Sequence, residues 1–364
     1  IKTITSLDML AFSSDAERKH YAFSDGNGYY IAEYENYKLI DKILYLSNRE
    51  YKEFAEKTNV TTDIEVDYLK ISPMIEENVE KEVIDAAINV IKAFLNYENK
   101  ASIVISGNKA RFLNDMGYVI DCTCPMFSAF TDYNEMTSYD EGSKTISWNY
   151  FVSRDEFQKI FADFTKTVEE YLAVIEKDDS DAMKAILLYY TMLHQASYDY
   201  EILGDAYETM DEAQYHLRDS SYNVFVNKTG ICTNLSQALM FLYTQAELTS
   251  GTVLHQGGAG AHMWVVVEID GQYYYCDPTW DVGTGPKTFG ITADDRGGWA
   301  GGYTKEEGRM LSTIIASKYQ IDDERFSILR EKIPVEITDI KVDKEQQTIT
   351  FIGYDYEYIF RCIK

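Results

Sequence analysis

The sequence has no apolar run long enough to cross a bilayer, which takes about 18 residues or more. It also has no charged and then apolar signal segment at its start. We therefore expect no membrane span in this chain. The chain opens on Ile1 without a methionine, which suggests that an N-terminal leader or anchor has been lost.

Basic residues are also few. The chain has 34 Lys and Arg against 60 Asp and Glu, for a formal net charge of −26. A phosphate backbone or an anionic lipid surface would be repelled by most of such a molecule. We therefore expect no nucleic-acid partner.

Cysteines are too few and too irregularly spaced for a small disulfide-rich fold or for a zinc-binding cysteine motif. The five cysteines form only one close pair, Cys122 and Cys124, whose disulfide state the sequence leaves open. A structural zinc site would need a second pair or nearby histidines. We therefore expect neither a metal nor another cofactor.

What is present indicates a large folded protein of α+β class. Hydrophobic residues make up 45% of the 364 residues and aromatic residues 14%, enough for a substantial core. We expect an α/β N-terminal region of unknown role over residues 1–140 and a second domain over 141–364. The patterns of the first region predict a hairpin over 19–34, helices over 47–58 and 76–97, strands over 101–106 and 118–124, and a loop over 132–144.

The second region has sharper signals. Ser153 and Glu156 have the spacing of a capping box ahead of a helix. A polar break at 176–181 separates that helix from the next, over 183–195. The patterns also predict a strand over 145–152 before these helices and strands over 335–360 at the end.

Three residues have the chemistry of thiol-based acyl transfer: Cys232, His262 and Asp277. A thiolate attacks, an imidazole moves protons, and a carboxylate holds the imidazole in the useful tautomer. Leu235 and Leu239 place Cys232 on the inward stripe of a helix that should begin near Ile231. The helix N-terminus would favour the thiolate there.

The histidine and the aspartate fall on one predicted hairpin. Asp270-Gly271 between two apolar segments is a strong signal for a two-residue turn. In that register Trp264 faces Asp277, and His262 lies diagonal to Asp277 on the same side, within reach of it. By alternation, Cys276 should point the other way.

These segments together resemble a known family. Tyr198-Asp199, Gly230-Ile231-Cys232, His262-Met263-Trp264 and Asp277-Pro278-Thr279-Trp280-Asp281 are similar to motifs of the bacterial transglutaminase-like domain, within the papain-like cysteine hydrolase superfamily. The resemblance covers about residues 165–295. It implies a helix bearing the cysteine packed on an antiparallel sheet. It also implies Cys232 as nucleophile, His262 as general base and acid, and Asp277 as orienter.

The resemblance also has departures and open positions. Thr233 to Ser236 stand where the family commonly has a small or acidic residue followed by Gly-Tyr-Ala, and Val265 replaces a common asparagine. Gln195 or Tyr198 could help to bind an oxyanion, as an upstream polar side chain does in papain-like enzymes. For both, packing at a helix end is the competing interpretation. Trp264 is a further candidate for the cleft.

The sequence thus predicts thiol-dependent acyl transfer or hydrolysis on a peptide, isopeptide or carboxamide, with a protein, peptide or cell-wall peptide as substrate. The alternative is an inactive transglutaminase-like fold acting as a surface binding or scaffold module, with Cys232 an inert buried thiol. A third possibility is that the N-terminal half covers the cleft. The family resemblance and the acidic composition favour an extracellular or cell-surface location.

Overall fold

The computed structural model describes residues 18–24, 28–35, 38–47, 62–134, 138–200, 202, 209–257, 260–282, 286–291, 318–319, 325–332, 339–353 and 356–363. For the three N-terminal strands it describes the backbone alone. Apart from Ser47, which ends β3, the helix expected over 47–58 lies outside the described residues.

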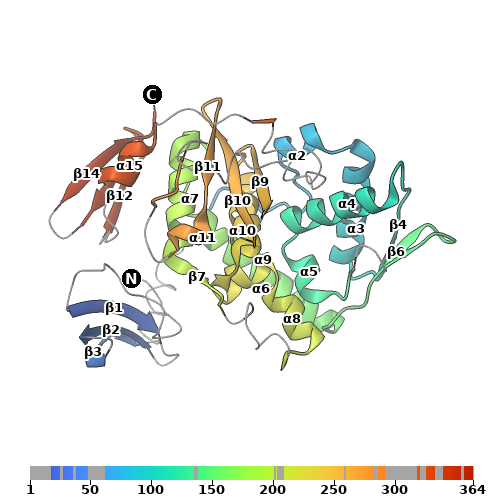
Figure 1. Ribbon diagram of the computed structural model, residues 1–364, viewed down its shortest axis with the longest axis horizontal. Helices are drawn as coiled ribbons and strands as arrows, with labels where there is room; N and C mark the ends of the chain where they lie inside the picture. The colour runs from blue at the N-terminus through green and yellow to red at the C-terminus, as the bar shows by residue number, and fades with distance from the viewer. Residues whose placement is uncertain are drawn as a thin grey trace.

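The chain has an α+β fold in which helices and small, mostly antiparallel sheets alternate (Figure 1). The helices are α2 (Pro73–Asn78), α3 (Lys81–Leu95), α4 (Lys109–Thr123), α5 (Met126–Phe130), α6 (Arg154–Leu172), α7 (Asp181–Gln195), α8 (Glu212–Arg218), α9 (Ser221–Val226), α10 (Cys232–Gln245), α11 (Pro278–Asp281) and α15 (Ser327–Lys332). The strands are β1 (Arg18–Ser24), β2 (Gly28–Glu35), β3 (Lys38–Ser47), β4 (Lys100–Ser102), β5 (Tyr139–Asp140), β6 (Thr145–Ser147), β7 (Ser197–Tyr198), β8 (Thr229–Gly230), β9 (Ser250–Gly257), β10 (Gly260–Ile269), β11 (Gln272–Cys276), β12 (Asp339–Asp343), β13 (Thr348–Ile352) and β14 (Glu357–Arg361).

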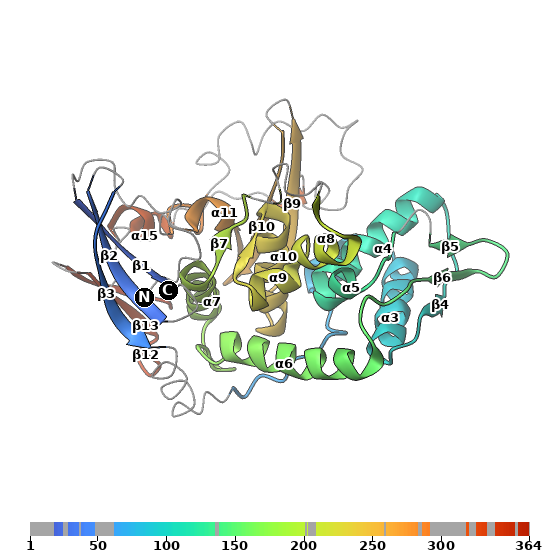
Figure 2. The ribbon, with the colours of Figure 1, turned by 90° about the horizontal axis from the view of Figure 1, so that it is seen from below.

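The centre of the molecule is helix α10 packed against the antiparallel sheet β11–β10–β9 (Figure 1). Helices α4, α7 and α9 also contact α10. Figure 2 shows α6 crossing the foot of α9 and α10, and α6 contacts both. Leu235, Leu239 and Leu242 are fully buried along α10, as their spacing predicts. The helix that begins at Cys232 is thus held on several sides.

The hairpin β10–β11 has the predicted register. Asp270 and Gly271 both have positive φ, 51° and 76°, as a type I′ turn requires. Ile269 pairs with Gln272, and the ladder runs to Val265 opposite Cys276. Asp277 lies just beyond the last pair and is the N-cap residue of α11.

Several predictions in the second region are confirmed. Ser153 and Glu156 form the expected capping box, with the Ser153 N–H donating to Glu156 at 2.9 Å, and α6 follows. The break before α7 and the terminal strands β12, β13 and β14 are also present. In the first region, β1 pairs with β2 as the predicted hairpin.

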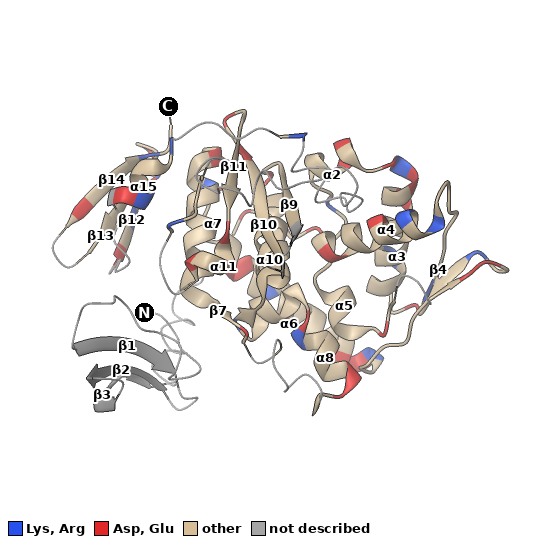
Figure 3. Ribbon diagram, viewed as in Figure 1, with Lys and Arg blue, Asp and Glu red and all other residues tan. Residues whose placement is uncertain are grey.

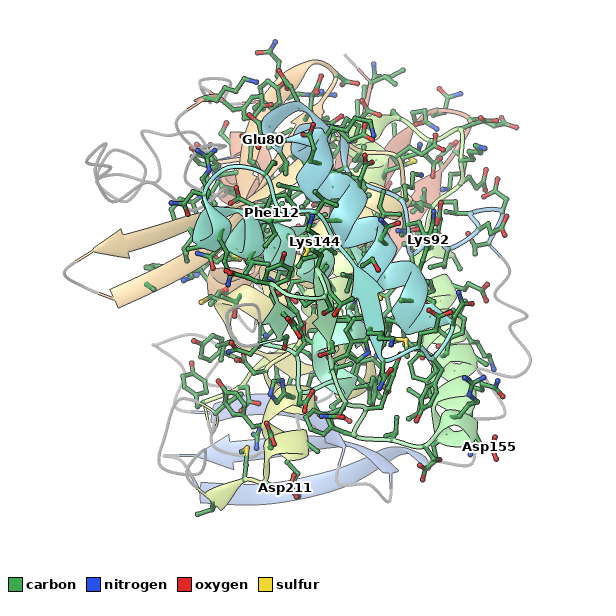
Figure 4. All side chains as sticks on the ribbon, turned by 90° about the vertical axis from the view of Figure 1, so that its right-hand side faces the viewer. Glu80, Lys92, Phe112, Lys144, Asp155 and Asp211 are labelled. Atoms are coloured by element: carbon green, nitrogen blue, oxygen red, sulfur yellow. The ribbon has the colours of Figure 1, made fainter. Side chains whose placement is uncertain are left out.

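Four predictions in the region from 76 to 152 were wrong in extent or type. The helix expected over 76–97 is interrupted where Val79 and Glu80 are extended, between α2 and α3 (Glu80 in Figure 4). The segment 118–124 belongs to helix α4, which Asn108 caps by accepting from the Arg111 N–H at 3.0 Å. The strands expected over 101–106 and 145–152 shrink to β4 and β6, since their mutual pairing lasts only three residues.

The early part of the chain is fastened to the central sheet and to α10. Ser72 Oγ donates to the Ser250 carbonyl at 2.6 Å and accepts from the Ser250 N–H at 3.0 Å. Asp67 and Gln245 exchange two hydrogen bonds of 2.8 and 3.1 Å in the same manner. Strands β4 and β6 also pair from either side of residue 140. The boundary expected near that residue stays a prediction.

The C-terminal sheet β12–β13–β14 is held beside α7. Gln347 Oε1 accepts from the Ser180 N–H at 2.9 Å, and Lys344 forms an ion pair with the buried Asp179. Arg325 donates to the Cys362 carbonyl and to Asp270 at the hairpin turn. Within the described ranges, no helix is both long and apolar enough to cross a membrane.

Candidate active site

Close backbone approach fixes the chain just before α10. Strand β7 pairs in parallel with β8, so Tyr198 lies opposite Gly230, and the Asp199 N–H donates to the Gly230 carbonyl at 3.1 Å. A Cβ on Gly230 would come within 2.7 Å of Val224 Cγ2 and 2.9 Å of Asn234 Cβ. Only glycine fits there without displacing its neighbours. Steric contacts at Gly230 therefore fix the path of the main chain that leads to Cys232.

The first turn of α10 is closed by Asn234, one of the residues that depart from the family pattern. Asn234 Oδ1 accepts from the Ile231 N–H at 3.0 Å, and its Nδ2 donates to Asp219 at 3.3 Å. An amide that satisfies a free N–H at a helix start stabilises that end. Cys232 is the first residue of the helix, in the position that the sequence predicts.

The structure brings Cys232, His262 and Asp277 together. His262 Nε2 lies 2.7 Å from Asp277 Oδ2, and the imidazole also hydrogen-bonds the Cys232 thiol. Because Nε2 faces Asp277, Nδ1 is the ring nitrogen left for the sulfur. The Asp277 side chain is fully buried and that of His262 is 12% exposed, whereas Cys232 is half-buried. Cys232 and His262 are thus partly open to solvent, whereas Asp277 is closed to it.

The surroundings of Cys232 favour the thiolate. Burial alone would raise the pKa of the thiol. It is outweighed by the hydrogen bond from His262, by the backbone N–H groups of Met263 and Thr233, and by the charge of His262, so the pKa lies below its usual value. A low thiol pKa in a partly open position is the mark of a reactive cysteine.

His262 is held in its protonated form. Burial would lower the pKa of the imidazole, but the hydrogen bonds to Asp277 and Cys232, with their negative charges, raise it to about 9. The two shifts go in opposite directions and describe one coupled pair. Both shifts favour the form of the pair in which Cys232 is a thiolate and His262 an imidazolium.

A second departure from the family pattern, Ser236, ties the cysteine helix to the histidine strand. Ser236 is fully buried, and its Oγ donates to the carbonyl of Met263 at 3.0 Å. Met263 follows His262, and its N–H reaches Cys232. One hydroxyl therefore fixes the spacing between the two elements that bear the reactive groups.

We expect Ser236→Ala to destabilise the protein by about 1–3 kcal/mol, because the Met263 carbonyl would be left buried without its donor. It should also slow alkylation of Cys232 at pH 6. Thr244→Val is the matched control, since Thr244 Oγ1 donates within α10 to the Met240 carbonyl at 2.9 Å. Urea unfolding and alkylation rates measure the two effects. Equal alkylation rates in the two variants would contradict the role assigned to Ser236.

Two tryptophans contact His262 from different sides. Trp264 is fully buried, with its ring stacked on the imidazole at 5.9 Å. Trp264, the further candidate for the cleft, is thus closed to solvent, and its buried ring packs on the His262 imidazole. Trp280 of α11 meets the imidazole edge-on at 6.3 Å and is 54% exposed. Trp280 is the tryptophan that a bound molecule could touch.

The other two cleft candidates differ in their placement. Tyr198 is half-buried near Cys232. Burial, and then the charge of Cys232, raise the pKa of its phenol to about 12, so it stays a hydrogen-bond donor. Tyr200, which is 62% exposed, packs edge-on against it at 4.7 Å. Gln195 ends α7, and no hydrogen bond joins it to Cys232, His262 or Asp277 in the described structure.

The remaining cysteines are poorly placed to react. Cys122, Cys124, Cys276 and Cys362 are buried and free, and burial raises the pKa of each thiol. Cys276 contacts Tyr243 of α10. Over the described ranges, no group of three or more His, Cys, Asp or Glu residues is arranged to hold a metal ion.

The sequence pattern predicts no role for Asp281, at the end of the DPTWD segment, or for the residues after it. The buried residues Asp281 and Tyr189 of α7 and the partly buried Thr288 of the following loop form a hydrogen-bonded group beside Asp277. The segment was visible as a motif, but the pattern did not indicate that Asp281 points inward. Only the packing of α11 on α7 reveals it.

No family model and no curated protein matches this chain. Two similar solved structures are a TGase, 19% identical with a TM-score of 0.28, and a candidate cysteine protease from Cytophaga hutchinsonii, 12% identical with a TM-score of 0.24. The match to the TGase covers 36% of this chain and 34% of the TGase chain. The match to the candidate cysteine protease covers 35% of this chain and 43% of the protease chain, so this chain spans less than half of either structure. At these TM-scores, neither match carries weight for the activity of this chain.

Proposed function

We propose that this protein is a thiol-dependent acyl-transfer enzyme of the transglutaminase-like type. Its substrate would be a peptide, isopeptide or carboxamide in a protein, a peptide or a cell-wall peptide. One observation carries the proposal: His262 contacts the buried carboxylate of Asp277 at 2.7 Å and the half-buried thiol of Cys232 at once. That is the arrangement that nucleophile activation requires.

In the first half of the reaction, the Cys232 thiolate attacks the substrate carbonyl carbon and a sulfur–carbon bond forms. Negative charge develops on the carbonyl oxygen, where the backbone N–H groups of Thr233 and Met263 and the Tyr198 phenol are the donors near the sulfur. His262 gives its proton to the leaving nitrogen, the carbon–nitrogen bond breaks, and an amine or ammonia departs. A thioester remains on Cys232.

In the second half, water or an amine attacks the thioester and passes a proton to His262. The sulfur–carbon bond then breaks, which releases the acid or the new amide and restores the thiolate and imidazolium. Asp277 keeps the imidazole oriented throughout and stabilises its charge. Hydrolysis and transfer to an amine share every one of these groups.

The charge of the chain limits the partners of such an enzyme. Acidic residues occur on elements from α2 to β14 (Figure 3), and the formal charge is −26. A nucleic acid would be repelled, whereas a neutral or basic peptide would not. An extracellular or cell-surface location, with a cell-wall or protein substrate, remains part of the proposal.

Thiol reactivity tests the proposal without knowledge of the substrate. Iodoacetamide at pH 6 should modify Cys232 at least about 100-fold faster than the other four cysteines, because only its pKa is lowered. Peptide mass spectrometry of the native protein measures all five sites together, so the buried thiols are internal controls. If Cys232 reacts no faster than they do until the protein unfolds, the chain is an inactive fold that serves as a binding or scaffold module.

A further inference from the structure

Asp281 is a buried carboxyl group without a cationic partner. Its side chain is 1% exposed at the end of α11, and no Lys, Arg or His in the described part of the chain pairs with it. It accepts hydrogen bonds from Tyr189 Oη at 2.6 Å and from the Thr288 N–H at 2.9 and 3.0 Å. A buried carboxyl group costs free energy even when it is hydrogen-bonded. Such a group is therefore a candidate for a specific role.

Thr288 links this carboxyl group to the main chain of Asp277. Thr288 Oγ1 donates to the Asp277 carbonyl at 2.8 Å and accepts from the Asp277 N–H at 3.3 Å. One hydroxyl thus holds both polar backbone groups of the residue that orients His262. The pairing of Tyr275 with Ile291 also holds the Thr288 segment against β11.

Helix α11 is too short to hold Asp277 by itself. It has four residues and begins with Pro278, which has no N–H to donate. The bond from the Trp280 N–H to the Asp277 carbonyl is long, at 3.3 Å. Among the contacts of Asp277 with described residues, the one to Thr288 and the 2.7 Å contact of its own side chain with His262 are both short.

We propose that Asp281 is a positioning residue for the reaction. Through Tyr189 and Thr288, it fixes the main chain of Asp277 and with it the oxygen that orients His262 toward Cys232. The proposal rests on the proposed acyl-transfer function. Asp281 itself would not touch the substrate.

The charge state of Asp281 suits this role. Burial raises the pKa of the carboxyl group to about 7, the nearby charge of Asp277 acts in the same direction, and the bonds from Tyr189 and Thr288 oppose both. The other titratable groups coupled to it are Tyr190 of α7 and Cys276 of β11. Near pH 7, the group therefore adds less than a full negative charge beside Asp277 while it keeps its acceptor oxygens.

The test compares three variants by the pH profile of Cys232 alkylation. Thr288→Val removes the hydroxyl that holds Asp277 and leaves the Asp281 carboxyl group and the Thr288 N–H in place. Asp281→Ala removes the anchor itself. In both, alkylation at pH 6 should fall by about 10-fold or more, because a loosened Asp277 no longer keeps His262 on the sulfur. Asp281→Asn, which retains one acceptor oxygen, should recover part of the rate.

Asp179→Ala is the matched control. Asp179 is also buried and accepts the Glu176 N–H at 2.8 Å, but it anchors the C-terminal sheet. Its loss should lower the melting temperature without changing the alkylation profile. If Asp281→Ala does not fold, the alkylation profile of Thr288→Val alone tests the inference. If Cys232 of the wild type alkylates quickly and the Thr288→Val and Asp281→Ala variants show the same pH profile, this inference is overturned. If Cys232 of the wild type itself alkylates slowly, the proposed function is overturned.

Discussion

Cys232→Ala is expected to lose at least about 1,000-fold of any peptide, isopeptide or carboxamide cleavage or transfer that the wild type performs. Without the sulfur, no acyl-enzyme can form, and the neighbouring N–H groups can act only on water. A fluorescent library of peptides and cell-wall peptides, assayed with and without an added amine, measures both hydrolysis and transfer. The same library would show which of the two reactions the enzyme favours.

Cys122→Ala is the matched control for this variant. Cys122 is a buried thiol of α4 with a raised pKa, so its loss removes a sulfur without touching the site. It should keep wild-type turnover once the folded fraction is equal. Equal rates for wild type and Cys232→Ala on every substrate would contradict the proposal that this protein is a thiol-dependent enzyme.

His262→Gln should reduce turnover by about 100- to 10,000-fold, the usual contribution of a general acid–base group. It should also change the pH dependence of the thiol. In the wild type, the reactive ion pair forms above the lowered pKa of Cys232 and persists until His262 loses its proton near pH 9. In the variant, burial of Cys232 remains but the histidine is gone, so the rise in alkylation rate should move to higher pH.

His216→Gln controls for the loss of an imidazole. His216 lies on α8, where its ring packs against Phe151 at 5.3 Å. This variant should keep both the turnover and the alkylation profile of the wild type. A His262→Gln protein with an unchanged profile would show that another group lowers the pKa of Cys232.

The parts of the site that local patterns could predict are those built from short segments. The helix start at Cys232 and the hairpin register at Asp270-Gly271 each depend on residues within a few positions of one another. Turn type and helical spacing act at that range. His262 and Asp277 followed from the register, even though Asp277 lies one residue past the ladder.

The parts that could not be predicted depend on contacts between distant segments. Trp264 faces the predicted side of the strand, but only the packing of α10 shows that this position is closed to solvent. The link from Asp281 to Tyr189 joins residues 92 positions apart. No periodicity in the sequence reports such a bond.

The misassigned segments of the first region have a similar cause. Val119 and Ile120 suggested a strand because β-branched residues favour strands. Both are fully buried as part of a helical stripe with Phe112 and Met116. Tertiary burial overrode the local preference there.

The hydrogen bonds that Asp67 and Ser72 make with Gln245 and Ser250 join residues 178 positions apart. During synthesis, these bonds cannot form until the whole cysteine helix and the start of β9 have left the ribosome. The histidine strand and the α11 turn follow within about the next 30 residues. The nascent chain would therefore carry Cys232 as an ordinary thiol until the histidine strand and the α11 turn have also been made, and the reactive ion pair could form only after that.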